Sequence, residues 1–197
     1  ERLVELFTRY EMKSWLKEAQ GESASGDPVA PAPQSAPSPA PDLLTDDGAH
    51  RAGYETILDW PAFDRWQAKI EAAPLTAIDT ETTSLDPFAA RIVGISFAVA
   101  PGEAAYLPLA HDYAGAPAQL PCDQALTRLK PWLESPLHAK IGQNLKYDEH
   151  VFANHGIALA GVAHDTLLQS YVLESGKEGV RGHDLGQLAL RHLGMQT

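Results

Sequence analysis

The sequence predicts an α/β domain in which helices flank a central mixed β-sheet. Two features support this fold class. Two apolar segments separated by a short turn at Gly102 are typical of an antiparallel hairpin. The segments that follow alternate between strand and helix patterns, which indicates additional strands joined through helices. The domain is expected to occupy residues 51–197, because residues 1–50 have a different composition.

Each element of this domain is predicted from its hydrophobic pattern and its flanking residues. Short apolar or alternating runs predict strands, and apolar residues at helical spacing predict helices, as at Phe63, Trp66 and Ile70. Asp165 is expected to cap the helix that it begins. In chain order, the patterns predict a strand at 54–58, a helix at 61–72, strands at 75–79, 91–99 and 104–109, a helix at 122–132, a strand at 139–142, and helices at 145–155, 165–174 and 184–192.

The first 50 residues are predicted to lie outside the domain. Residues 1–20 carry apolar side chains at helical spacing, which predicts a terminal helix that packs against another surface. Residues 21–50 contain six prolines among Ala, Ser and Gln, and this composition predicts a disordered linker. A proline-rich ligand is the alternative, but its aromatic and basic anchors are absent. Because the chain begins with Glu1 rather than Met, we expect it to start inside a longer protein.

Composition narrows the classes of function. With 15 basic and 26 acidic residues, the net charge is −11, which argues against a broad basic surface for nucleic acid. It does not exclude a DNA enzyme whose centre is a carboxylate–metal site. The single cysteine, Cys122, excludes a disulfide framework and fits a reducing cytoplasm. The sequence contains no apolar stretch long enough to span a bilayer, so no membrane partner is expected.

Two acidic residues, Asp79 and Glu81, lie two positions apart at the end of a predicted strand. The period of a strand places both side chains on one face, about 6.6 Å apart along the backbone. Carboxylates at that separation are able to share one cation, and oxygen-only ligation suits Mg²⁺ or Mn²⁺. Acidic residues at strand ends are more often solvated, so the pair alone leaves a metal site and a surface charge both open.

A second polar cluster follows the next short strand and begins a helix. Asp148 lies one turn into that helix and would supply a third carboxylate. Gln143, Asn144, Lys146 and Tyr147 add hydrogen-bonding groups, a cation and an aromatic ring, which are the groups that hold a single-stranded nucleic-acid end. The alternative is that Asn144 caps the helix and Asp148 is a solvated charge in its first turn. Both interpretations remain open on this motif alone.

Together these motifs resemble a known family. Residues 79–82 (Asp-Thr-Glu-Thr) resemble the first exonuclease motif of the bacterial DNA polymerase I family, and residues 144–148 (Asn-Leu-Lys-Tyr-Asp) resemble the second. Residues 6–11 are similar to the end of that family's 5′-nuclease region, and residues 105–113 and 183–188 are also similar to the family. The resemblance implies an RNase H-like 3′–5′ exonuclease fold for the domain, preceded by the last helix of a 5′-nuclease region and the linker.

The resemblance also implies a two-metal mechanism, with two Mg²⁺ or Mn²⁺ ions about 4 Å apart at the scissile phosphate. Asp79 would bridge both ions, Glu81 would bind the first and orient the attacking water, and Asp148 would hold the second. Leu85 would wedge against the terminal base. The positions implied to contact DNA are Thr80, Thr82, Leu85, Gln143, Asn144, Lys146 and Tyr147.

One departure from the family concerns its third exonuclease motif, a Tyr followed four residues later by an Asp. Here Tyr171 is followed by Ser175, so the motif is missing and the domain is expected to be truncated at its C-terminal end. The 197-residue chain alone is therefore expected to bind metal weakly and to degrade DNA poorly. The implied partners are a DNA primer-template with a single-stranded 3′ end, and polymerase and 5′-nuclease domains of the same chain. That parent chain is expected to be a monomer in the bacterial cytoplasm, at the nucleoid, with roles in proofreading, DNA replication and repair.

Two alternatives remain beside this reading. A free-standing exonuclease of the same fold would act on RNA, but the linker and the helix before it argue for a tethered domain. A non-catalytic domain would only brace a polymerase. The presence of Asp79, Glu81 and Asp148 argues against a brace, because clustered carboxylates repel one another when no metal offsets their charge.

Overall fold

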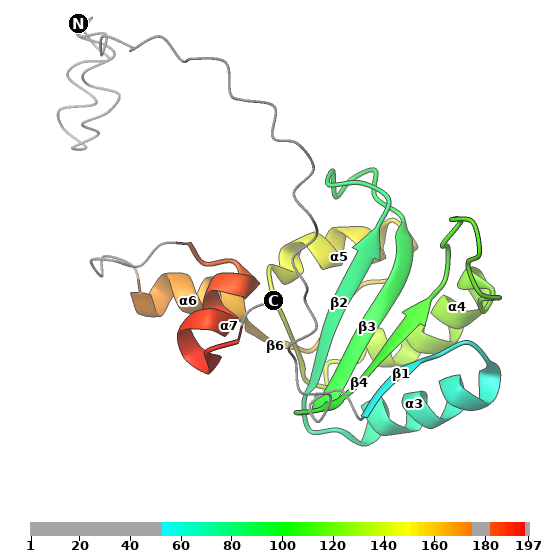
Figure 1. Ribbon diagram of the computed structural model, residues 1–197, viewed down its shortest axis with the longest axis horizontal. Helices are drawn as coiled ribbons and strands as arrows, with labels where there is room; N and C mark the ends of the chain where they lie inside the picture. Colours follow the sequence, from blue (N-terminus) through cyan, green and yellow to red (C-terminus); the bar gives the residue numbers. More distant parts are fainter. Residues whose placement is uncertain (1–52, 175–181, 196–197) are drawn as a thin grey trace, which may run out of the picture. The chain divides into compact units, whose positions relative to one another are not determined.

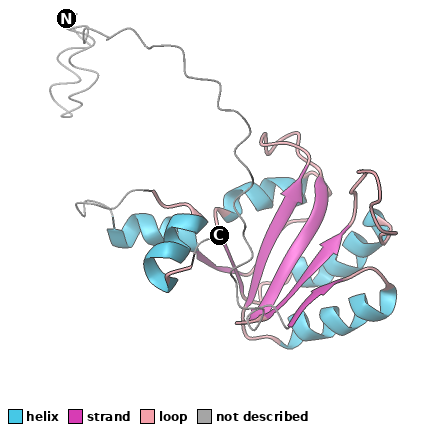
Figure 2. Ribbon diagram, viewed as in Figure 1, coloured by secondary structure: helices cyan, strands magenta, loops and turns pink. Residues whose placement is uncertain are grey.

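The computed structural model describes residues 53–174 and 182–195, and it shows a six-stranded sheet with flanking helices (Figure 1, Figure 2). The predicted helix at 1–20 and linker at 21–50 lie outside the described residues. The elements are β1 (Gly53–Thr56), α3 (Trp60–Ala72), β2 (Thr76–Thr82), β3 (Ile92–Ala100), β4 (Glu103–Pro108), α4 (Cys122–Leu133), β5 (Lys140–Gly142), α5 (Leu145–Ala153), β6 (Val162–Asp165), α6 (Thr166–Glu174) and α7 (Leu185–Leu193).

The sheet is mixed, as the sequence predicts. Its strand order is β1-β4-β3-β2-β5-β6. Strands β2, β3 and β4 form an antiparallel meander, while β1, β5 and β6 add to it in parallel pairs. The predicted hairpin between β3 and β4 turns at Gly102, whose φ of 77° is left-handed and favours glycine. The meander therefore forms the centre of the sheet, and the carboxylates predicted to form the site lie on one of its strands.

The hydrophobic core lies on one face of the sheet. Ile78, Phe97 and Ala105 form a buried row across β2, β3 and β4 on this face. Trp132 of α4 packs edge-on against Phe97 and donates a hydrogen bond to the carbonyl of Ile70 in α3. Helices α3, α4 and α5 thus cover this face with their apolar stripes. The opposite face carries the alternate residues of the same strands and borders a hollow of about 610 Å³.

A fully buried lysine, Lys140, begins β5. Its ammonium donates hydrogen bonds to the carbonyls of His138 and Ala160 at 2.9 Å and lies 3.3 Å from the carbonyl of Ser135. The ammonium also lies 4.5 Å from the centre of the Trp132 ring. Burial lowers the pKa of Lys140 to about 8. The carbonyls around it therefore receive hydrogen bonds from a side chain.

The structure differs from the prediction at two strands. Strand β6 was not expected, because Val162, Ala163 and His164 are exposed and show no alternating pattern. It is defined by backbone pairing with β5 at the edge of the sheet. Strand β2 continues to Thr82, beyond the predicted end at Asp79, because β3 remains paired with it as far as Ile92. Asp79 is therefore held within a strand rather than at its end.

Candidate functional site

Asp79 and Glu81 lie on the open face of β2. Both side chains are exposed, whereas Thr80 between them is buried against the helices. Strand β3 pairs with both residues, Ser96 with Asp79 and Gly94 with Glu81, so the spacing of the two carboxylates is set by the sheet. The structure thus places the two carboxylates side by side on a rigid element, as their spacing in the sequence predicts.

The third predicted carboxylate, Asp148, approaches the same strand from the helix side. Its side chain is 2% exposed, so the alternative that it is a solvated charge is wrong. The backbone amide and the hydroxyl of Thr80 donate to Asp148 Oδ1 at 3.1 and 2.6 Å. Burial raises the pKa of Asp148 to about 6, the Thr80 hydroxyl opposes this shift, and the charge of Asp79 adds to it.

The local charge favours a cation. Partial desolvation of its carboxylate, together with the neighbouring charge of Glu81, raises the pKa of Asp79, while the Thr80 amide partly opposes the shift. Two carboxylates whose pKa values are raised, Asp79 and Asp148, therefore lie around Thr80 with no basic side chain hydrogen-bonded to either among the described residues. A divalent ion would offset their negative charge.

Within residues 53–174 and 182–195, no three His, Cys, Asp or Glu side chains are arranged to enclose a metal ion. Of the three carboxylates, Asp148 is turned toward Thr80, and Asp79 and Glu81 share the open face. This arrangement fits Mg²⁺, which is commonly bound through one or two carboxylates together with substrate phosphates and water. The oxygen-only donor set also fits Mg²⁺ or Mn²⁺ better than zinc.

The loop after β2 is joined to α5 through Tyr147. The Tyr147 hydroxyl lies 2.5 Å from Thr82 Oγ1 and donates to the carbonyl of Ser84 at 2.5 Å. Leu85, at the tip of this loop, is 96% exposed. Lys146 is exposed and lies outside the depression that these residues line. That depression has a volume of about 530 Å³ and is lined by Asp79, Thr80, Glu81, Thr82, Thr83, Ser84, Leu85, Gln143, Asn144, Tyr147 and Asp148.

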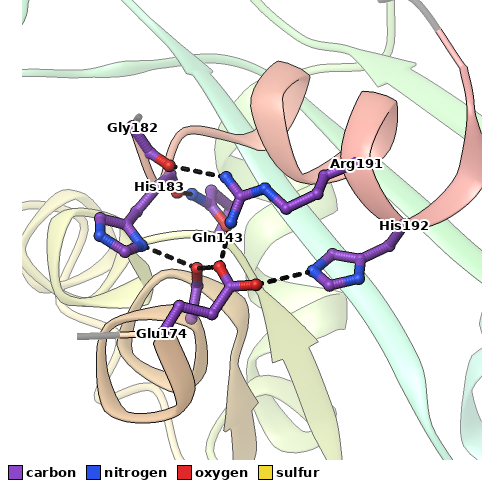
Figure 3. Close-up of polar contacts among 7 residues, drawn as sticks. Gln143, Glu174, Gly182, His183, Arg191 and His192 are labelled. Atoms are coloured by element: carbon purple, nitrogen blue, oxygen red, sulfur yellow. Dashed lines mark hydrogen bonds and ion pairs between the residues drawn. The ribbon is translucent and has the colours of Figure 1, made fainter. Parts of the chain in front are cut away.

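Gln143 also lines this depression, but its amide is held from the other side. Its Nε2 donates to the carbonyl of His183 at 2.8 Å, and its Oε1 accepts a hydrogen bond from Thr166 (His183 and Gln143 are labelled in Figure 3). The contacts of Gln143 therefore connect the end of β5 to the start of α6 and to the residues that lead into α7.

Helices α6 and α7 are joined by a polar network around Glu174 (Figure 3). The Glu174 carboxylate accepts hydrogen bonds from Ser170 at 2.9 Å and from Arg191, and it lies 3.5 Å from His192. The Ser170 hydrogen bond is the main cause that lowers the pKa of Glu174, with Arg191 acting in the same direction. No sequence motif marked this network, because its members are far from the two exonuclease-like motifs.

Tyr106 is a further residue beside the carboxylates that the sequence pattern did not single out. It pairs with Ser96 across β4 and β3, so it shares the open face with Asp79. Its hydroxyl lies 2.6 Å from His111 Nε2. Burial raises the pKa of Tyr106, and the charge of Glu81 adds to the shift. The ring occupies the space over Gly94, where a β-carbon would lie 2.0 Å from the Tyr106 hydroxyl.

Comparison with known proteins defines the class to which this fold and site belong. Residues 54–197 match the model of a family described as 3′–5′ exonuclease, and the chain belongs to that family. The chain is similar to DNA polymerase I of Pseudomonas aeruginosa, with 44% identity across 100% of this chain and 20% of that protein. It is 40% identical to DNA polymerase I of Rhizobium leguminosarum, across 73% of this chain and 15% of that protein. The chain thus spans about a fifth of these relatives or less, and the predicted resemblance to the DNA polymerase I family is confirmed.

Solved structures confirm the RNase H-like fold. The POL domain of Pol1 from M. smegmatis, in complex with DNA primer-template and dNTP, has a TM-score of 0.55 at 22% identity, covering 72% of this chain and 23% of that one. Escherichia coli RNase D has a TM-score of 0.52 at 18% identity, covering 73% of this chain and 34% of that one.

Among the described residues, no helix combines the length and apolar character needed to cross a membrane.

Proposed function

We propose that Asp79, Glu81 and Asp148 form the centre of a metal-dependent exonuclease that hydrolyses the terminal phosphodiester bond of a DNA 3′ end. One observation carries this proposal. Two carboxylates share the open face of β2, and a third, buried carboxylate is hydrogen-bonded to the residue between them. This arrangement occurs in a chain of the 3′–5′ exonuclease family.

Mg²⁺ or Mn²⁺ is the cofactor that this donor set fits, and the complete site would hold two ions. Asp79 and Glu81 would hold them on the open face, and Asp148 would complete the second position. A solved structure of Brucella melitensis NrnC contains bound Mg²⁺ and shares this fold, with a TM-score of 0.50 at 21% identity. When bound, such ions lower the pKa of a water molecule and neutralise the charge that develops on the phosphate.

The chain's own residues position the reacting groups. Glu81 accepts a hydrogen bond from the attacking water and aligns it with the scissile phosphate, and such positioning lowers the activation barrier. Asp79 lies two residues away on the same face and would hold the cations that neutralise the phosphate charge. Thr80 keeps Asp148 against β2, so the third carboxylate stays in reach of the site.

The depression beside the carboxylates is the proposed path of the DNA strand. Leu85 projects from the loop after β2 and would wedge against the terminal base. Tyr147 and Asn144 also line the depression, where an aromatic ring and an amide are able to hold a splayed nucleotide. Thr80, Thr82 and Gln143 complete the proposed contact surface. Lys146 lies outside the depression and would meet a phosphate further along the strand.

The parent protein is proposed to be a bacterial DNA polymerase I that carries polymerase and 5′-nuclease domains beside this one. It would act as a monomer on primer-template DNA in the cytoplasm, at the nucleoid. The identities to the Pseudomonas aeruginosa and Rhizobium leguminosarum DNA polymerases support this proposal. A structure of similar fold holds a DNA primer-template, which also supports it.

A comparison of substrates tests the proposal. The full-length natural protein would be incubated with 5′-labelled single-stranded DNA and with RNA of the same sequence, each with Mg²⁺ or with EDTA. With Mg²⁺ we expect the DNA to shorten one nucleotide at a time from its 3′ end and the RNA to shorten more slowly. With EDTA neither strand should shorten. Faster digestion of RNA would indicate an RNA exonuclease, and no metal-dependent shortening of either strand would indicate a bracing domain.

A further inference from the structure

We infer that Asp165 is a positioning residue for the half of the site that α5 carries. Its carboxylate fixes the turn at Asn144 and the first residue of α5, the helix on which Asp148 lies. The inference rests on the proposed function for its effect on catalysis. Its structural part, the fixing of the turn, stands on the hydrogen bonds alone.

The carboxylate of Asp165 receives hydrogen bonds from two helix starts at once. Its Oδ1 accepts from the backbone amide of Asn144 at 3.2 Å, and its Oδ2 accepts from that of Leu145 at 2.8 Å. Its Oδ1 also accepts from the amides of Leu167 at 2.9 Å and Leu168 at 3.2 Å, in the first turn of α6. These amides have no partner within their own helices, so one side chain satisfies donors of both. It thereby locks the start of α5 to the end of β6.

Thr166 and Gly142 hold the same turn from its other end. The Thr166 hydroxyl lies 3.1 Å from the carbonyl of Gly142 and also contacts Gln143 Oε1. A β-carbon at Gly142 would lie 2.7 Å from the carbonyl oxygen of Ile78 in β2, so the backbone packs directly on the strand that carries Asp79. The turn between β5 and α5 is therefore held both by β2 and by the residues at the junction of β6 and α6.

Asn144 needs this support because its backbone is left-handed. With φ 60° and ψ 44°, it is the sole non-glycine residue of positive φ in the part of the chain that the structure describes. Such conformations persist only where their surroundings determine them, and they gather at functional sites. The Asn144 side chain makes no capping hydrogen bond to α5. Because Asp165 caps the helix instead, the side-chain amide of Asn144 stays available to the depression that it lines.

The test compares Asp165→Asn with Asp59→Asn in the full-length protein. Asp59 caps α3 by accepting from the Ala62 amide at 2.8 Å, and it lies outside the depression, so Asp59→Asn is the same substitution at a helix cap away from the site. Asparagine at 165 replaces one carboxylate oxygen with an amino group, which leaves the Asn144 or the Leu145 amide without its acceptor. We expect Asp165→Asn to lower kcat for 3′-end hydrolysis about 10- to 100-fold, as small misplacements at a site do. Asp59→Asn should leave kcat within about twofold, because the asparagine oxygen still accepts from the Ala62 amide.

A second measurement is independent of activity. Hydrogen–deuterium exchange would be followed by mass spectrometry in the peptide that contains Asn144 and Leu145. It should be faster in Asp165→Asn than in the wild type and unchanged in Asp59→Asn. Unchanged exchange in Asp165→Asn, a wild-type kcat, or an equal loss of kcat in Asp59→Asn would overturn the inference. A wild-type protein without nuclease activity would refute the proposed function, and the exchange result would still decide whether Asp165 fixes the turn.

Discussion

The backbone amide and the hydroxyl of Thr80 both donate to Oδ1 of Asp148, at 3.1 and 2.6 Å. Thr80 separates Asp79 from Glu81 in β2, so one strand presents two carboxylates on its open face and holds a third from its buried side. The two motifs of the site, 68 residues apart in the chain, are joined at this point. A change in either motif is therefore expected to affect the other.

The burial of the Asp148 carboxylate should lower the free energy of unfolding at neutral pH. The pKa of Asp148 is raised to about 6 in the folded state, against about 3.9 in an unfolded chain. The folded state therefore binds more protons between pH 4 and 6, and its stability falls as pH rises through that window. Asp148→Asn, which keeps an acceptor for Thr80, should raise the free energy of unfolding at pH 7 by about 1–3 kcal/mol in urea titrations without divalent ions.

The gain in unfolding free energy of Asp148→Asn should disappear near pH 4, where the wild-type Asp148 carboxyl is itself neutral in the folded state. Glu149→Gln serves as the control, because Glu149 is the next residue of α5 and is exposed. It should leave the free energy of unfolding almost unchanged at both pH values. A loss of stability in Asp148→Asn at pH 7, or an equal gain at pH 4, would show that ionisation of the buried Asp148 carboxylate does not destabilise the fold.

Because of Lys140, the free energy of unfolding should rise with pH between pH 8 and pH 10. Its pKa is lowered by burial to about 8, while that of a lysine in an unfolded chain is about 10.4. Between these values the unfolded state binds more protons, so this residue makes the free energy of unfolding rise with pH. From pH 8 to pH 10, the wild type should gain about 1–3 kcal/mol relative to Lys140→Met in urea titrations.

The control for this experiment is Lys69→Met, which removes an exposed lysine that pairs with Glu103. Its stability should follow the wild type over the same pH range with a constant offset. Curves of unfolding free energy against pH that run parallel for the wild type and Lys140→Met would contradict the account of Lys140.

Gly94 should tolerate no side chain while Tyr106 is present. A β-carbon at residue 94 would lie 2.0 Å from the Tyr106 hydroxyl, and moving the ring would break its contact with His111. Gly94→Ala is expected to lower the free energy of unfolding by about 1–3 kcal/mol, as overpacking does. In a double-mutant cycle with Tyr106→Ala, most of that loss should be recovered. Strictly additive effects of the two substitutions would show that the ring does not occupy this space.

Most of the fold was predictable because the elements carry strong local patterns. Phe63, Trp66 and Ile70 recur at helical spacing, and all three are buried by α3. Strand β6 was missed because its exposed residues carry no hydrophobic signal, and only its pairing with β5 defines it. The parallel pairing of β1 with β4 was also beyond prediction, since it joins segments separated by three other elements.

The site was predictable where chemistry and spacing are local. The period of a strand alone places Asp79 and Glu81 on one face. By contrast, the burial of Asp148 depends on contact with Thr80, and the support of Asn144 depends on Asp165, 21 residues away. These contacts form only when distant segments pack together, so no local pattern reports them. Tyr106 escaped notice for the same reason, because only the sheet register brings it to the open face.

The central claim is that Asp79 belongs to a 3′–5′ exonuclease centre, and one measurement tests it most directly. The full-length protein and its Asp79→Ala variant would be given a primer with a mismatched 3′ end, with Asp112→Ala, which removes an exposed carboxylate outside the depression, as the control. Removal of the mismatched nucleotide and extension of a matched primer would be followed in parallel. We predict that Asp79→Ala abolishes removal and retains extension, while Asp112→Ala keeps both. Removal at the wild-type rate by Asp79→Ala would contradict the account.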